Sequence, residues 1–350
     1  MLFGRKDIIG LDIGSKHIKV VQLKESKGGH RLERLGITTL QPELIVDGSI
    51  LDSTRVVEAI KELVSNTGIK AKDVTLAVSG HSSVIIKRVS LPQMSEEELE
   101  EQIRFEAEQY IPFDIQDVSL DFQILGPAEE ENMMDVLIVA VKKDKISEYV
   151  TVVKDAGLNP VIVDVDAFAL ENIHELNYEV KEGENVALVN IGAGMININI
   201  LKGGISVFTR DSSIGGNLLT EALQREFTIS YANAEKLKQE ETVEGVPPED
   251  VKAVMKLAFE DIINEISRSF DYFRDTTNYE NIDEIILSGG VALTKDFAEA
   301  LSERVGVKVT VAEPFKNIEV PETFDKEYLQ KISPLVAVAV GLALRRVGDK

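Results

Sequence analysis

The sequence predicts a duplicated α/β fold, in which two halves each open with a β-hairpin and a smaller α+β unit is inserted into the first half. Apolar runs over residues 8–14 and 18–23 flank a short polar turn and indicate the first hairpin. A similar pattern recurs where the run 186–194 leads into residues 195–201. Helical and strand periodicities alternate between and after these hairpins, which is typical of layered α/β halves.

The two hairpins indicate an internal duplication. Aligning Asp12 with Asn190 gives an offset of 190 − 12 = 178 residues. At this offset identical residues coincide along both hairpins: Ile13 with Ile191, Gly14 with Gly192, Ile18 with Ile196, Leu23 with Leu201, and Lys24 with Lys202. The alternative is that two unrelated glycine-turn hairpins look alike by chance, because short motif matches include false positives.

Local signals place the other elements. A helical period of apolar residues predicts a helix over 54–67 that ends at Gly68. A second helix is expected over 95–111, because Ser95 and Glu98 form a capping box and a proline follows. Strands are expected over 74–78, 118–125, 135–141 and 282–287, and further helices over 218–227, 251–276 and 334–346.

These elements divide the chain into four segments. Residues 1–84 form the first part of the first half, and residues 85–155 form the inserted unit. Residues 156–183 return to the first half. Residues 184–350 form the second half, and its final helix is expected to return to the first half.

Composition narrows the function. The 38 basic and 60 acidic side chains give a formal net charge of −22, which disfavours nucleic acid as a partner. The absence of cysteine excludes a disulfide scaffold and a thiol nucleophile. The four histidines are not at metal-ligand spacing, so a zinc site is not expected.

The chain carries no signal for export or for crossing a membrane. Its first residues, MLFGRK, lack the apolar stretch of a signal peptide. The longest apolar run, residues 335–344, has ten residues, whereas a membrane span needs about 20. We therefore expect a cytoplasmic protein with no membrane span of its own.

Glycine-rich turns predict a nucleotide cleft. Asp12 ends a strand before a tight turn, so it offers a ligand to a water bound to Mg²⁺, and the turn offers backbone N–H groups to phosphate. Glu235 and Lys238 lie one helical turn apart and are candidates to hold a ribose and a base. The full set of candidate ligand-binding residues is Asp12, Gly14, Ser15, Lys16, Asn190, Gly192, Ala193, Gly194, Gly215, Gly216, Asn217, Glu235, Lys238, Gly289, Gly290 and Val291.

Two further expectations concern these turns. The pair Gly215–Gly216 precedes a helix whose N-terminus is a potential anion site. Lys16 and Lys19 both follow the first turn, but strand alternation should make them diverge, so Lys16 alone is expected at phosphate.

The order of these motifs resembles the actin-like ATPase superfamily, with a duplicated, ribonuclease H-like fold. The resemblance implies ATP between the halves and connecting helices at 165–176 and 334–346. Other nucleotide signatures, namely a GxxxxGK[ST] P-loop and a GxGxxG after the first strand, are absent. No serine nucleophile elbow occurs either.

Within that superfamily the chain resembles, almost end to end, the PilM family of type IV pilus assembly proteins. The resemblance rests on three sequence segments: VSLPQM at residues 89–94, EAEQYIPF at 106–113 and PVIVDVDAFA at 160–169. It implies an inserted subdomain placed as in FtsA. It also implies an ATP-binding scaffold at the cytoplasmic face of the inner membrane. In that family the partner is the cytoplasmic N-terminal segment of PilN, which docks between the first subdomain and the inserted one.

One departure bears on catalysis. Asn190 stands where the second phosphate motif usually begins with aspartate, and an amide is a poorer base than a carboxylate. Only Asp164, Asp166 and Glu171 are candidates to orient an attacking water. Hydrolysis is therefore expected to be slow or absent. The alternatives are an active ATPase or sugar-kinase-like phosphotransferase of the same fold, and a filament-forming protein like FtsA.

Overall fold

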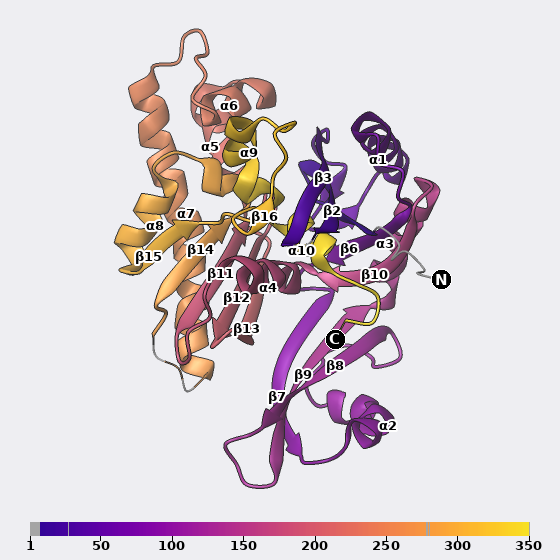
Figure 1. Ribbon diagram of the computed structural model, residues 1–350. Coiled ribbons are helices and arrows are strands. Elements are labelled where there is room, and N and C mark those ends of the chain that lie inside the picture. The colour runs from indigo at the N-terminus through magenta and orange to yellow at the C-terminus, as the bar shows by residue number, and fades with distance from the viewer. Residues whose placement is uncertain (1–7, 27, 278, 280, 350) are drawn as a thin grey trace.

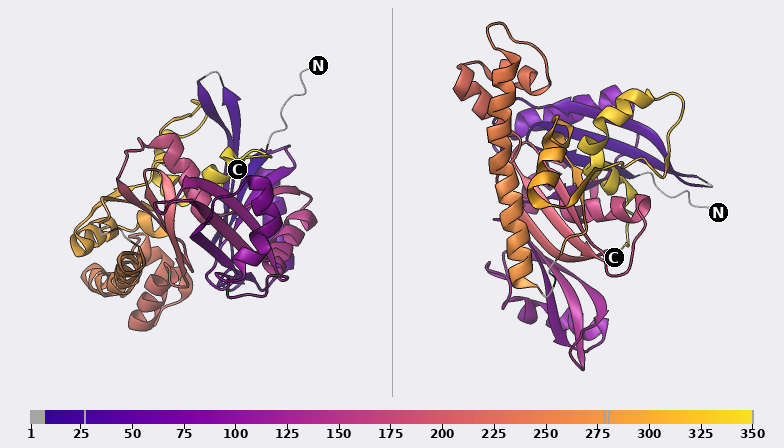
Figure 2. Two further views of the ribbon diagram at one scale, coloured as in Figure 1. Left: turned by 90° about the horizontal axis from the view of Figure 1, so that it is seen from below. Right: turned by 90° about the vertical axis from the view of Figure 1, so that its left-hand side faces the viewer.

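The computed structural model describes residues 8–26, 28–277, 279 and 281–349. Two α/β halves lie side by side, and a smaller unit projects from the first half (Figure 1). The long helix α7, Pro248–Thr276, runs along the outer side of the second half (Figure 2). The duplicated α/β fold predicted from the sequence is therefore confirmed.

The first half is built on a mixed sheet with strand order β10-β6-β1-β2-β3-β16. Helices α1 (Ser53–Thr67) and α3 (Lys143–Asp155) contribute to the apolar cluster on one face, where they meet Ile9 and Leu11. The strands are β1 Ile8–Ile13, β2 His17–Ser26, β3 Gly29–Thr39, β6 Asp73–Val78, β10 Asn159–Val165 and β16 Ile318–Glu319. A short hairpin, β4 Ile45–Val46 and β5 Ser49–Ile50, follows β3.

The second half has a sheet with the order β13-β12-β11-β14-β15. One of its faces is covered by a cluster that includes residues of α5, α7 and α8. The strands are β11 Asn185–Ile191, β12 Ile196–Lys202, β13 Ile205–Ser212, β14 Glu284–Ser288 and β15 Lys308–Val311. The helices are α5 Asn217–Phe227, α6 Tyr231–Lys238 and α8 Phe297–Val305, with the 3₁₀ turn η1 at Gly290–Leu293.

The internal duplication extends to the hydrogen-bond register. In the first hairpin Asp12 pairs with Lys19 and Ile13 with Ile18. In the second, Asn190 pairs with Asn197 and Ile191 with Ile196, which is the same register shifted by 178 residues. Both turns also close with the same bond, from the glycine N–H to the carbonyl three residues later. The shared register therefore supports duplication over a chance likeness.

The inserted unit is a small sheet with the order β7-β9-β8, covered by helix α2. Its elements are β7 Val84–Pro92, α2 Glu96–Ala107, β8 Val118–Pro127 and β9 Met133–Lys142. Ser95 and Glu98 form the predicted capping box, with the Ser95 side chain accepting from the N–H of Glu98. The sequence-based boundary at residue 155 differs from this arrangement, because α3 packs Val152 and Val153 into the core of the first half.

Two helices fill the space between the large sheets. Helix α4, Asp166–Asn177, and helix α10, Ala337–Leu344, share a cluster with Val21 of one sheet and Leu188 of the other. Helix α9 (Lys326–Ile332) and the 3₁₀ turn η2 (Ser333–Val336) lead into α10. The sequence-based boundaries of both connecting helices agree with α4 and α10 to within a few residues.

Within the described residues, one helical stretch is long and apolar enough to cross a membrane. It runs over Lys326–Leu344, through α9, η2 and α10. Residues 337–343 of α10 are all buried in the core between the two sheets. Its apolar character is therefore explained by packing between the halves.

The crossing of α4 and α10 leaves no room for a side chain. A Cβ at Gly341 would lie 1.8 Å from the carbonyl oxygen of Ala169, and one at Gly10 would lie 2.2 Å from the carbonyl oxygen of Ala339. Glycine at these positions lets α10 touch both α4 and β1. The two halves are thus held together by close backbone contacts.

We expect Gly341→Ala to lower the free energy of unfolding by about 2 kcal/mol, because the added methyl overpacks the crossing. This loss runs against the gain of about 1 kcal/mol that alanine gives over glycine in a helix. Urea unfolding measures the change. Gly28→Ala, where a Cβ meets no atom within 4 Å, is the control. Equal stability of Gly341→Ala and wild type would contradict the proposed steric role.

Candidate functional site

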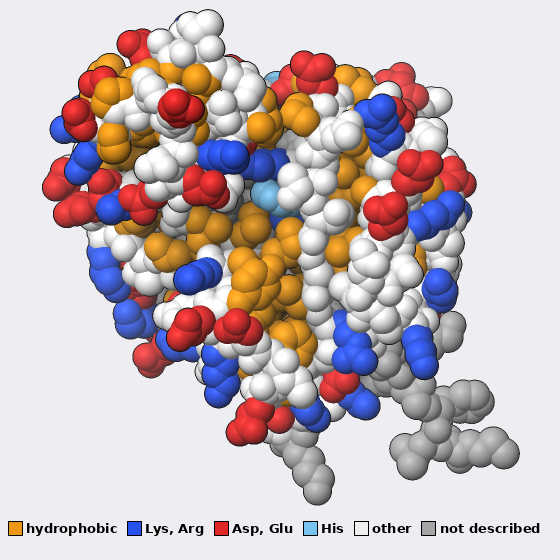
Figure 3. All heavy atoms as spheres, turned by 90° about the horizontal axis from the view of Figure 1, so that it is seen from above, with side chains coloured by type: hydrophobic (Ala, Val, Ile, Leu, Met, Phe, Trp, Pro, Cys, Tyr) orange, Lys and Arg blue, Asp and Glu red, His pale blue; other side chains and the backbone are white. Residues whose placement is uncertain are grey.

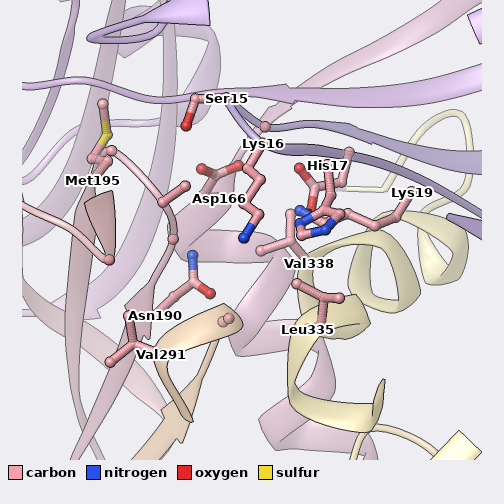
Figure 4. A pocket seen from close by; sticks show the side chains of 18 of the residues that line it. Ser15, Lys16, His17, Lys19, Asp166, Asn190, Met195, Val291, Leu335 and Val338 are labelled. Carbon is pink, nitrogen blue, oxygen red and sulfur yellow. The ribbon is translucent and has the colours of Figure 1, made fainter. Parts of the chain in front are cut away.

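A cavity of about 500 Å³ lies between the two halves, at the end of the sheets where both hairpin turns meet. Nearly all of the predicted ligand-binding residues line it. Among the residues that the structure describes, the exceptions are Gly215 and Asn217. In Figure 4, Lys16, Asp166 and Asn190 point into this cavity from different parts of the chain.

The first turn brings two lysines into the cavity. Gly14 donates its N–H to the carbonyl of His17 at 3.1 Å, which closes the turn. Lys19 lies opposite Asp12 in the strand register, and its Nζ donates to Asp12 Oδ2 at 2.9 Å. The expectation that Lys19 would diverge from Lys16 is wrong, because Lys16 lies in the turn before β2 begins and strand alternation does not apply to it.

The second turn is supported from behind by the glycine pair. The N–H of Gly216 donates to Gly192 at 2.9 Å, and the N–H of Asn217 donates to Ala193 at 2.7 Å. A Cβ at Gly215 would lie 2.6 Å from the carbonyl oxygen of Ala193. The expected anion site at this helix start is therefore replaced by a packing role, since these N–H groups are already bonded to the turn.

Charged side chains meet at the cavity from both halves. Lys16 of the first half forms an ion pair with Glu235 of α6 in the second half. Glu235 Oε1 also accepts from Lys238 Nζ at 3.0 Å and from Thr220 Oγ1 at 2.5 Å. Burial alone would raise the pKa of Glu235, but the charge of Lys238 and the hydrogen bonds of Lys16 and Thr220 lower it to about 2. Glu235 is therefore an anion that ties the halves together.

His17 adds a neutral group to this basic region. Burial, and then the positive charges of Lys19 and Lys16, lower the pKa of His17 to about 3. The imidazole is therefore uncharged at neutral pH, and the positive charge of the cavity resides on lysines. Ammonium groups gathered in this way, in a chain of net charge −22, favour an anionic ligand.

The three acidic candidates for orienting water are separated by the structure. Asp166, at the start of α4, lines the cavity, whereas Asp164 is buried and pairs with Arg345 at 3.1 Å. Glu171 faces Asn199 at 3.4 Å, and burial raises the pKa of Glu171 to about 7. Burial, and then the charge of Asp12, raise the pKa of Asp166 as well. Of these candidates, Asp166 alone is placed to act on a ligand in the cavity.

Asn190 has a structural reason to be an amide. Its Oδ1 accepts from Ser288 Oγ at 3.2 Å, and its Nδ2 donates to Asn197 Oδ1 at 3.0 Å. A carboxylate could accept from Ser288 but could not donate to Asn197. Asn190 therefore belongs to a hydrogen-bonded row across the sheet, in addition to its place in the second phosphate motif.

Most of the side chains at the other end of the cavity are apolar. This end is lined by Gly290 and Val291 after β14, and by Leu293, Tyr328 and Leu335. Gly289 has φ +87°, and a Cβ there would lie 2.3 Å from the carbonyl oxygen of Ile191, so only glycine suits this turn. Viewed from above, a hollow is bordered by basic and histidine side chains and, beside them, by hydrophobic ones (Figure 3).

A short hairpin that was not predicted from the sequence, β4 and β5, borders the cavity. Asp47 and Gly48, both with positive φ, form the turn between β4 and β5 and line the cavity. Lys145 and Tyr149 of α3 hold this turn by donating to the carbonyl of Gly48, Tyr149 Oη at 2.8 Å. The Asp-Gly pair between apolar residues is a typical hairpin signal and could have been recognised.

The comparisons with known proteins bear on the family. The model of the family described as type IV pilus assembly protein PilM matches residues 10–347. The chain belongs to the PilM family. A chain of the PilM–PilN type IV pilus biogenesis complex is 28% identical, with a TM-score of 0.85, and the match covers 98% of this chain and 99% of that one.

More distant relatives of this PilM-family protein share the fold. The cell division protein FtsA of Escherichia coli K12 is 21% identical over 97% of this chain and 90% of FtsA. MreB5 of Spiroplasma citri, solved with AMPPNP, is 14% identical with a TM-score of 0.55, over 97% of this chain and 95% of that one. The actin-like fold with an FtsA-type insertion, inferred from the motifs, is thus confirmed.

The carboxylates of the cavity in this PilM-family protein suit a Mg²⁺ ion. Asp12 and Asp166 both line the cavity, and the charge of Asp12 contributes to the raised pKa of Asp166. A divalent cation near both would relieve this repulsion, and carboxylate oxygen is the donor that Mg²⁺ prefers. No cluster of three or more His, Cys, Asp or Glu side chains suited to a metal occurs in the described part of the chain. The residues therefore fit an ion that keeps most of its waters.

We expect Asn190→Asp to lower the free energy of unfolding by roughly 2 kcal/mol, because it places two acceptors against each other at Asn197. Chemical denaturation measures this change. The control is Asn281→Asp, at an exposed asparagine of the same half. An Asn190→Asp protein as stable as wild type would show that the Asn190–Asn197 bond contributes nothing.

Asp166 should make stability depend on pH. Because its pKa is raised in the folded state, the unfolded chain loses this proton more readily, and stability falls as the pH rises above the ordinary carboxyl range. We expect Asp166→Asn to lose less stability than wild type between about pH 5 and pH 8. Denaturant midpoints across that range measure it. Parallel pH profiles for the two proteins would contradict the raised pKa.

Proposed function

We propose that this protein is an ATP-binding scaffold of the type IV pilus inner-membrane platform, which binds the cytoplasmic N-terminal segment of a PilN-like membrane protein. The observation that carries the nucleotide part is the cavity itself. One end gathers Lys16, Lys19 and Lys238 with their carboxylate partners Asp12 and Glu235, and the other is mostly apolar and backed by glycine. A ligand with a polyanionic end and a flat ring matches both ends.

ATP would lie along this axis. The triphosphate would meet Lys16, Lys19 and the turns at Gly14 and Gly192, whose glycines allow close approach of the backbone. The ribose would contact Glu235, and Glu235 would then lose part of its contact with Lys16. The adenine ring would lie against Gly290 and Val291, with Tyr328 at the rim. The solved MreB5 bound to AMPPNP has the same fold and supports this choice of ligand class.

Mg²⁺ would accompany the nucleotide through water molecules held by Asp12, and Asp166 would be the second carboxylate near it. The ion would neutralise phosphate charge in this site. Lys19 already neutralises one oxygen of Asp12 at 2.9 Å. The remaining Asp12 oxygen and Asp166 would therefore orient the water shell of the ion.

Slow hydrolysis is the expected behaviour. Asn190 uses its amide within the sheet and is no base. The observation in favour of an active ATPase is Asp166, a cavity carboxylate whose raised pKa suits proton transfer near neutral pH. Turnover of one or more ATP per second by wild type, lost in Asp166→Asn, would establish that alternative.

The proposed PilN-like segment would bind between the first half and the inserted unit. Strands β10 and β8 are edge strands of their sheets. Residues 161–163 of β10 are apolar and only half-buried, and Asp121 of β8 is close enough to affect the pKa of Asp164. An extended peptide can pair with such an edge. The partner would bring the protein to the cytoplasmic face of the inner membrane.

We expect wild type to bind Mg-ATP, and Lys19→Gln to bind it at least about tenfold more weakly, because a charged hydrogen bond to phosphate is lost. Isothermal titration calorimetry measures both affinities. Lys24→Gln, at an exposed lysine of the same strand, is the matched control and should bind as wild type does. No ATP binding by wild type would refute the nucleotide part of the proposal.

The partner part is tested with a synthetic peptide from the cytoplasmic N-terminus of a PilN-like protein. We expect it to bind wild type, and Asp121→Lys to weaken that binding about tenfold or more, because the charge beside the proposed groove is reversed. The control is Glu129→Lys, in the β8–β9 connection. Equal affinity of wild type, Asp121→Lys and the control would place the peptide elsewhere.

A further inference from the structure

A row of side chains crosses the second sheet at the level of the cavity. Ser288 of β14, Asn190 of β11, Asn197 of β12 and Asp211 of β13 are neighbours in the strand register. Beyond the two bonds of Asn190, Asn197 Nδ2 donates to Asp211 Oδ1 at 2.8 Å. Every donor in this row points the same way, from β14 toward β13. The row ends at Asp211 because a carboxylate only accepts.

Asp211, the last acceptor of the row, binds the segment of the first half that connects β6 to β7. Asp211 Oδ2 accepts the backbone N–H of Gly80 at 2.7 Å. Gly80 has φ +120° and starts the turn in which its carbonyl accepts from Ser83 and Val84, both at 2.9 Å. This turn joins β6 to β7, the first strand of the inserted unit. The second half therefore forms a hydrogen bond with the segment that connects the first half to the inserted unit.

The middle of the row lines the proposed nucleotide cavity. Asn190 and Asn197 both line it, and Ser288 is followed directly by Gly289 and Gly290, which line it too. Ser79, next to Gly80, lines the same cavity and a second, more open one of about 880 Å³ between β7 and β13. The row thus connects the glycine turn of the cavity to the turn that carries the inserted unit.

The return connection of the inserted unit also reaches the cavity. Strand β9 leads directly into α3, whose Lys145 and Tyr149 hold the carbonyl of Gly48. Gly48 lines the cavity. The outgoing crossing is therefore bonded to the row through Asp211, and the returning crossing is bonded directly to a residue that lines the cavity.

We propose that the row Ser288–Asn190–Asn197–Asp211 couples nucleotide occupancy of the cavity to the orientation of the inserted unit, with Asp211 as the link between the halves. This inference rests on the proposed nucleotide binding. A nucleotide that shifts the Gly289 turn displaces the Ser288 end of the row, and one that shifts the turn between Asn190 and Asn197 displaces its middle. The strand register fixes the partner of each member of the row. A displacement of one side chain is therefore passed to the next and finally to Gly80.

Because this chain has no cysteine, spin labels attach only at cysteines introduced by mutation. Spin labels are placed at Glu131→Cys in the inserted unit and Glu260→Cys on α7, both exposed positions. Double electron–electron resonance then gives the distance between them with and without a non-hydrolysable ATP analogue. We expect the analogue to shift this distance in the otherwise wild-type protein, and the shift to be lost in Asp211→Asn, which cannot accept from both Asn197 and Gly80 as the carboxylate does.

A matched control separates the link from general weakening of the fold. Asp283 Oδ2 accepts the backbone N–H of Asn185 at 2.7 Å, on the same half but away from the row, so Asp283→Asn should keep the shift. Calorimetry with ATP is run on each protein. A shift that persists in Asp211→Asn, or no shift in wild type that binds ATP, overturns the coupling. No ATP binding by wild type overturns the proposed nucleotide function as well, and calorimetry identifies that case.

Discussion

The fold depends on one close crossing between α4 and α10 in the space between the two sheets. Gly341 of α10 faces the carbonyl of Ala169 in α4, and Gly10 of β1 receives α10 from the other side. Because these contacts are between backbones, they fix the distance between the halves more narrowly than flexible side chains would. The turns and glycines that line the cavity belong to strands on either side of this crossing.

The charges of the cavity differ from those of the chain as a whole. The chain as a whole is strongly acidic, yet the cavity collects Lys16, Lys19 and Lys238 from two halves. Glu235 balances part of this charge and joins Lys16 to Lys238. An anionic ligand that enters the site would meet a preorganised set of donors, and it would compete with Glu235 for Lys16. The ion pair therefore gives the nucleotide a means to alter contact between the halves.

Much of the fold could be predicted from local patterns. The two hairpins, their offset and the capping box at Ser95 follow from periodicity and capping chemistry, and the structure has them in place. The limit of the inserted unit could not be predicted, because an amphipathic helix such as α3 does not show in its sequence which core it covers. The glycine turns were recognisable as a group, whereas the backing role of Gly215 depends on contacts with Ala193, far away in sequence. The row through Asn190 needs the strand register, which single residues do not reveal.

The place of α10 in the chain has a consequence for synthesis. Among the described elements this helix comes last in chain order, yet it covers β1, which comes first, so the contact between Gly10 and Ala339 joins positions far apart in the sequence. Contacts of such long sequence separation form slowly and late. While the ribosome is still at work, the inner face of the first sheet lacks its covering helix, and its apolar residues are exposed to aggregation or to chaperones. The nascent protein therefore completes its first half only after α10 has emerged from the ribosome.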